Sequence, residues 1–184
     1  GLVNSHNVGV LREFSEIWRI PTIWWPYAAL AQYEPAAPAA DLVCDLAYTG
    51  NMDAQHVLYR RRTAFVQKLA ACIPTKVFET QKEGDLRFRT PELSTSARAL
   101  LSLPADGDVP GYIDVRPFQY GGAGALLLQR WVPALAPVFD MHEHMLAFEG
   151  YNVGAAEEMW QLSADVELGR KRRDAIFTLV QAKH

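Results

Sequence analysis

The sequence has little cysteine, no excess of basic residues and no catalytic motif of the common kinds. Its two cysteines, Cys44 and Cys72, cannot form a disulfide scaffold and are expected to be free thiols. The 184 residues carry a formal net charge of −3, whereas dedicated nucleic-acid-binding proteins usually carry a basic excess. A GxSxG elbow and an HExxH zinc motif are both missing. We therefore expect no dedicated nucleic-acid binding, and we assign no catalytic residue, cofactor or metal.

Uninterrupted apolar runs are also missing, because proline or glycine breaks each of the two most apolar stretches. Residues 20–33 hold no charge, and residues 117–139 hold only Arg130. The first stretch is too short to cross a bilayer, and the arginine in the second would cost about 2.5–3.5 kcal/mol on insertion. We expect no transmembrane anchor, while a peripheral position beside a membrane stays open. Exposed apolar segments of this kind mark interaction surfaces, and a neighbouring subunit of a larger assembly would bury them.

Large aromatic side chains gather near the N-terminus, and such side chains dominate both domain cores and protein interfaces. The residues expected at an interface are Trp18, Trp24, Trp25, Tyr27, Tyr33 and Trp131. The alternative is an aromatic cluster in the core of the same domain. Because residues 34–40 are rich in alanine and proline, they are expected to link an N-terminal aromatic arm, residues 1–33, to a single body, residues 41–184.

Hydrophobic periodicity predicts a mostly helical body. The clearest helix is expected over residues 53–73, with Leu58, Phe65 and Leu69 buried and Arg61, Arg62 and Lys68 exposed. Further helices are expected over residues 8–18, 90–103, 125–148 and 155–182, a hairpin over 76–80 and 86–90, and an edge strand over 112–120. These elements predict an α+β fold: a mostly helical single domain with a small antiparallel sheet or hairpin and an extended N-terminal arm.

His142 and His144 form the local pattern that most resembles a metal site. On a strand, two histidines at this spacing would share a face and could bind zinc or iron. The surrounding apolar spacing instead favours a helix, on which the two rings point apart. A third ligand would have to come from His6, His56, Glu143 or Glu149. We expect these histidines not to bind a metal jointly.

The run GGAGALLL, starting at Gly121, partly matches the GxGxxG loop of dinucleotide-binding proteins. Gly122 and Gly124 supply the first two positions, but Leu127 occupies the third. The expected elements also lack the alternation of strands and helices that builds a parallel sheet. A tightly packed turn is the simpler interpretation.

The function expected from these features is that of a non-catalytic structural or accessory subunit of a large assembly, acting through contacts with other protein subunits. An organellar (mitochondrial) complex and a virion shell fit equally, since a chain that starts with Gly1 is compatible with a matured polypeptide. The alternative is a small metal-dependent enzyme centred on His142 and His144. The sequence predicts that the protein is not an enzyme.

Overall fold

The body of the protein is built around one fully parallel sheet of five strands. The structure is a computed structural model, and it describes residues 3–5, 15–17, 19, 22–24, 34–57, 59–79, 89–104 and 114–183. The strands of the sheet are β3 (Cys44–Gly50), β4 (Thr75–Glu79), β5 (Ala97–Ser102), β6 (Leu127–Trp131) and β7 (Leu146–Glu149). They lie in the order β4-β3-β5-β6-β7. The strand of this sheet that comes first in the chain, β3, is therefore interior, with β4 on one side and β5 on the other.

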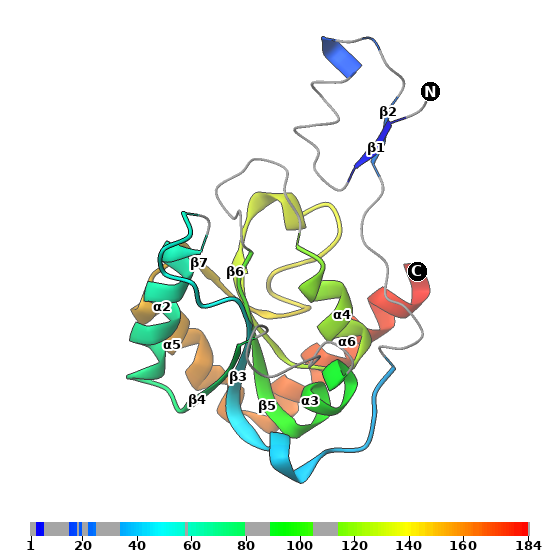
Figure 1. Cartoon of the computed structure of the whole chain (residues 1–184). Helices are drawn as coiled ribbons and strands as arrows, with labels where there is room; N and C mark the ends of the chain where they lie inside the picture. The colour runs from blue at the N-terminus through cyan, green and yellow to red at the C-terminus, as the bar shows by residue number, and fades with distance from the viewer. Residues whose placement is uncertain are drawn as a thin grey trace.

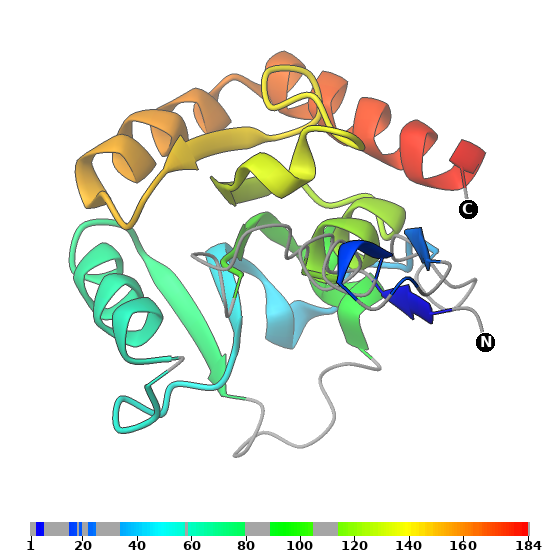
Figure 2. The same ribbon diagram turned by 90° about the horizontal axis from the view of Figure 1, so that it is seen from above.

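Helices cover both faces of this sheet (Figure 1). The helices α2 (Arg60–Ala70) and α5 (Val153–Gln161) pack on one face, and the view from above shows them on the same side of the strands (Figure 2). The opposite face carries α3 (Thr90–Ser96), α4 (Arg116–Gly122) and α6 (Val166–Lys183). Short 3-10 turns are η2 (Ala40–Leu42), η4 (Pro133–Leu135) and η5 (Leu162–Ala164). Because both faces are covered, the central strands are buried on both sides.

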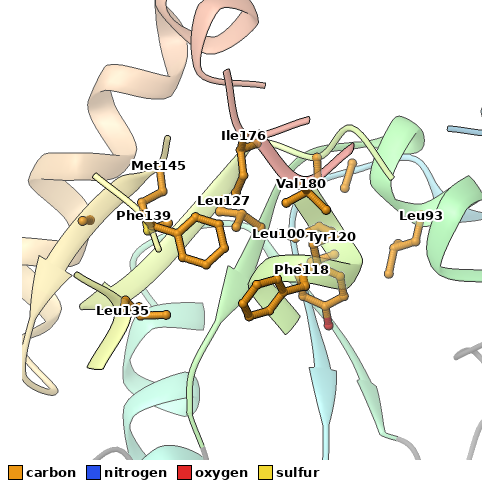
Figure 3. Close-up of a cluster of buried hydrophobic side chains, with 14 of the residues drawn as sticks. Leu93, Leu100, Phe118, Tyr120, Leu127, Leu135, Phe139, Met145, Ile176 and Val180 are labelled. Carbon is orange, nitrogen blue, oxygen red and sulfur yellow. The ribbon is translucent and has the colours of Figure 1, made fainter. Parts of the chain in front are cut away.

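The core beneath α4 and α6 brings together side chains that are far apart in the sequence (Figure 3). Phe118 on α4 lies with its ring centroid 5.1 Å from that of Phe139, which precedes β7. Gly121 lets α4 approach α6 closely, since a Cβ at this position would lie 2.7 Å from Cγ1 of Ile176. Both Phe118 and Ile176 are fully buried. Glycine is thus required by packing at this contact.

The core on the other face is centred on α2, as the periodicity predicted. Phe65 and Leu69 are buried, and Arg61 and Lys68 are exposed, which confirms that part of the expected helix. The exposure expected for Arg62 is wrong, because this residue is only 2% exposed. The helix also begins later than expected, since a loop separates β3 from Arg60.

The predicted fold class is wrong, because the sheet is large and parallel where a small antiparallel one was expected. Residues 97–102 form β5 and residues 127–131 form β6, although both stretches were expected to be helical. The expected edge strand over 112–120 is largely the helix α4. The proposed hairpin partner of β4 lies mostly outside the described residues, and β4 itself pairs in parallel with β3. The helix expected over residues 155–182 is interrupted at η5, which separates α5 from α6.

The second apolar stretch owes its character to burial within this domain. Residues 117–139 comprise most of α4, the interior strand β6 and the turn that follows. Phe118, Leu127 and Leu135 from this stretch are all at most 1% exposed. No neighbouring subunit is needed to cover these residues, which removes one of the two reasons for expecting a structural subunit.

The N-terminal region contains a short parallel pair, β1 (Val3–Ser5) with β2 (Thr22–Trp24). The side chains of the expected interface residues Trp18, Trp24, Trp25, Tyr27 and Tyr33 lie outside the described part of the chain. Trp131, at the end of β6, is partly buried against the core beneath α4. The N-terminal arm therefore stays a prediction. No helix in the described segments is both long and apolar enough to span a bilayer.

Candidate functional site

The strand order reverses between β3 and β5, and at such a point open α/β sheets form a crevice outside the carboxyl ends of the strands. The chain leaves β3 for α2 on one face and leaves β5 for α4 on the other. In open parallel sheets, ligands bind outside the carboxyl ends of the strands at such a point of divergence. The carboxyl ends of β3 and β5 are therefore the first place to look for a site.

Arg116, at the start of α4, lies across this crevice. Its Nη1 donates to Oδ2 of Asp114 at 2.5 Å and to the carbonyl oxygen of Leu103 at 3.4 Å. Its Nη2 is 3.5 Å from the carbonyl oxygen of Thr49. Thr49 is at the end of β3, and Leu103 directly follows β5. The guanidinium thus places hydrogen-bond donors where the two strand ends would otherwise present carbonyl oxygens.

Arg116 keeps its charge in this position. Burial alone would lower the pKa of Arg116, but electrostatic interactions with the Asp114 carboxylate and the hydroxyl groups of Tyr120 and Tyr48 raise it above its usual value. The Arg116 side chain is still 18% exposed, against 7% for Asp114. A permanently charged, partly accessible guanidinium is well suited to bind an anion.

Two tyrosines flank the crevice on its two sides. The hydroxyl oxygen of Tyr120, on α4, lies 2.5 Å from Oγ1 of Thr49. The ring of Tyr48 folds over Gly50, where an added Cβ would lie 2.5 Å from the Tyr48 hydroxyl oxygen. Tyr48 is fully buried, and its hydroxyl finds no hydrogen-bond partner within the described part of the chain. The end of β3 is therefore tightly packed and polar at the same time.

Two further arginines lie at the same edge of the sheet. Arg62, in the first turn of α2, donates from Nη2 to the carbonyl oxygen of Asn51 at 3.0 Å. Arg130, near the end of β6, is 6% exposed and lies 4.1 Å from the ring centroid of Tyr151. Among the described residues, Asp114 is the only buried carboxylate. The described part of the carboxyl edge thus holds more buried positive than negative charge, which favours an anionic ligand.

The burial of Tyr48 gives a testable pH dependence. Burial raises the pKa of Tyr48 to about 12, although the charges of Arg62 and Arg116 oppose the rise. The unfolded chain has the ordinary tyrosine value of about 10. The contribution of the neutral Tyr48 hydroxyl to the free energy of unfolding is therefore complete below about pH 10. It is lost as the pH rises towards 12, because Tyr48 ionises first in the unfolded state.

Between pH 10 and 12 the free energy of unfolding should fall in both proteins. We expect the fall in the Tyr48→Phe variant to be smaller than that in the wild type by about 2 kcal/mol. At neutral pH it should be as stable as the wild type or more so, because the hydroxyl it removes is buried without a described partner. Urea unfolding at both pH values measures the difference. Equal losses in the two proteins would show that Tyr48 ionises as readily in the folded state as in the unfolded one.

The histidines of the metal hypothesis lie elsewhere, in a turn before β7. The helix expected over these residues is absent: residues 141–143 form a turn. Nδ1 of His144 accepts the backbone N–H of Asp140 at 2.9 Å, and Oδ1 of Asp140 accepts the N–H of His142 at 2.7 Å. The N–H of His142, foremost, and that of Glu143 hold the pKa of the Asp140 carboxyl below its usual value. Among the described residues, no three His, Cys, Asp or Glu side chains are grouped to hold a metal.

The arginines and tyrosines of the crevice were not predicted from the sequence. The sequence nevertheless carries two signals: the polar residues TGN at the end of an apolar strand, and the pair of Asp114 with Arg116 at the start of a helix. The alternation of strands and helices that was expected to be missing is present, but the glycines are not placed for a dinucleotide loop. Gly121 and Gly122 end α4, whereas that motif lies between a strand and the start of a helix.

Several solved structures share this architecture. The chain aligns over 98% of its length with sucrose-phosphate synthase from Thermosynechococcus elongatus, at 14% identity and a TM-score of 0.64, and covers 53% of that protein. A pneumococcal O-GlcNAc transferase, solved with UDP and GlcNAc, matches over 98% of the chain at 9% identity and a TM-score of 0.59, with 41% of its own length covered. An α1,3-fucosyltransferase matches over 79% at 12% identity and a TM-score of 0.53, with 48% covered. No protein-family model and no curated protein matches the sequence.

These matches establish a Rossmann-like α/β fold of the kind found in glycosyltransferases, and the chain spans about half the length of the proteins it resembles. They contradict the expectation of a non-catalytic structural or accessory subunit of an organellar complex or virion shell. The alternative of a metal-dependent enzyme centred on His142 and His144 finds no support either.

Proposed function

We propose that this chain is the nucleotide-binding part of a glycosyltransferase that uses a nucleotide-activated sugar as donor. The observation that carries the proposal is the position of Arg116, whose guanidinium spans the ends of β3 and β5 in a fold that several glycosyltransferases share. A diphosphate is the ligand group that this position suits best, because arginine binds phosphate oxygens through several N–H donors at once.

The chemistry of glycosyl transfer explains why a cation is useful at this place. In that reaction, an acceptor hydroxyl bonds to the anomeric carbon and gives up its proton, while the bond between this carbon and the diphosphate oxygen breaks and negative charge accumulates on the departing diphosphate. A fixed guanidinium beside the diphosphate stabilises this charge as it develops. The carbonyl oxygens of Leu103 and Thr49 hold Arg116 at the strand ends, so the guanidinium needs little reorganisation during the step.

The experiment that tests this proposal is a calorimetric titration of the full chain with UDP, GDP and ADP. We expect saturable binding of one nucleotide per chain, and stronger binding of the preferred nucleoside diphosphate than of its nucleoside. The diphosphate group should be the source of this difference in affinity, because Arg116 lies at the crevice. If no nucleoside diphosphate binds, or if the nucleoside binds as tightly, the proposal is wrong.

A further inference from the structure

Asp114 contacts Arg116 in two ways, and the two contacts have different consequences for a ligand. Oδ1 of Asp114 accepts the backbone N–H of Arg116 at 3.2 Å, which fixes the start of α4. Oδ2 accepts from Nη1 of the Arg116 side chain at 2.5 Å, which is much shorter than the contacts from the guanidinium to the carbonyl oxygens of Leu103 and Thr49. The carboxylate is therefore the strongest partner of the guanidinium in this state.

A ligand phosphate at the crevice meets this carboxylate directly. Both groups are anions that seek the same guanidinium, and Asp114 is only 7% exposed, so water screens the repulsion poorly. Arg62 also lies near Tyr48 at this strand end, but its Nη2 donates to the carbonyl oxygen of Asn51 and not to a carboxylate. Arg116 is thus the cation at the crevice for which a phosphate and a protein carboxylate compete.

We propose that Asp114 is a built-in competitor of the ligand phosphate. Its carboxylate occupies Arg116 in the empty protein and keeps the guanidinium across the strand ends, and a diphosphate binds by taking over that guanidinium. Asp114 thereby positions Arg116 and at the same time lowers the affinity of the protein for the diphosphate. This inference rests on the proposed function, since it concerns the same site and the same class of ligand.

The Asp114→Asn variant separates the two contacts. The amide oxygen of asparagine still accepts the N–H of Arg116, so the start of α4 is kept, while the negative charge that opposes the phosphate is removed. We expect UDP and inorganic pyrophosphate to bind this variant at least about fivefold more tightly than the wild type. Uridine, which lacks phosphate, should bind both proteins equally. A gain in affinity is a result that mere structural damage does not produce.

The matched control is Glu149→Gln, which removes a charge at the end of β7, where the side chain is exposed. Its effect on UDP affinity should stay below about twofold, because water screens an exposed charge. A gain in the control equal to that of Asp114→Asn would show a general charge effect and overturn the inference. Equal or weaker UDP binding by Asp114→Asn would overturn the inference and leave the proposed function standing. If neither the wild type nor Asp114→Asn binds UDP or pyrophosphate, both proposals are wrong.

Discussion

Replacing Arg116 with methionine should weaken binding of a nucleoside diphosphate by about thirtyfold to a thousandfold. The loss of a partly buried charged partner commonly costs about 2–4 kcal/mol of binding free energy, which corresponds to that range. Methionine keeps much of the length of the side chain but has no N–H to donate. The strand-end carbonyl oxygens of Thr49 and Leu103 would then face the phosphate without their cover. Calorimetric titration of both proteins measures the change.

Two further variants distinguish lost binding from lost folding. Arg116→Met leaves the buried carboxylate of Asp114 without its cation, which alone destabilises the fold. The double variant Asp114→Asn with Arg116→Met removes both charges and should regain thermal stability without regaining affinity. Arg170→Met serves as the control, because Arg170 on α6 is 61% exposed and its ion pairs within the described residues are with acids of its own helix. Recovery of affinity in the double variant would contradict a direct role for Arg116.

The second large effect concerns stability: Phe65→Ala should lower the free energy of unfolding by about 3–5 kcal/mol. Phe65 is 2% exposed, and its ring stacks on that of Phe148 with centroids 5.5 Å apart. It also contacts the ring of Tyr151, with centroids 5.7 Å apart, and Arg130 lies over that ring. The substitution would leave a cavity between α2 and the sheet, next to the Tyr151 ring that Arg130 covers.

Urea unfolding of the two proteins measures this cost. The exposed Lys68 on the same helix provides the control, and Lys68→Ala should change stability by less than about 0.5 kcal/mol. A loss below about 1 kcal/mol for Phe65→Ala would mean that this side chain is not part of a tightly packed core. The interpretation of α2 as the centre of the second core would then fail.

The sequence predicted α2 well and the central strands poorly, for a physical reason. The apolar residues of α2 recur every three or four positions because one face of this helix is exposed. The strands β5 and β6, with sequences ARALLS and LLQRW, are buried on both faces and show no alternation. They also lack β-branched residues and consist largely of good helix formers. Tertiary packing, which local propensity does not encode, makes them strands.

The candidate site was hidden by the same error. With β5 taken as a helix, the prediction contains no parallel sheet. Asp114 and Arg116 then fall within an expected edge strand and not beside the carboxyl end of β5. Arg62 lies in a run of three arginines, a pattern typical of an exposed helix face. The burial of Arg62 depends on the loop after β3, because the carbonyl oxygen of Asn51 in that loop accepts a hydrogen bond from the Arg62 guanidinium. Only the strand order brings these residues to one edge of the sheet.

A crystal structure of the chain with bound UDP would test the central claim most directly. We predict that the diphosphate lies outside the carboxyl ends of β3 and β5, within hydrogen-bonding distance of the Arg116 guanidinium. Asp114 should then have given up its contact with Nη1 of Arg116. A diphosphate bound at the opposite edge of the sheet, where Arg172 and Arg173 donate to the carbonyl oxygens of Met145 and Arg98, would contradict the account.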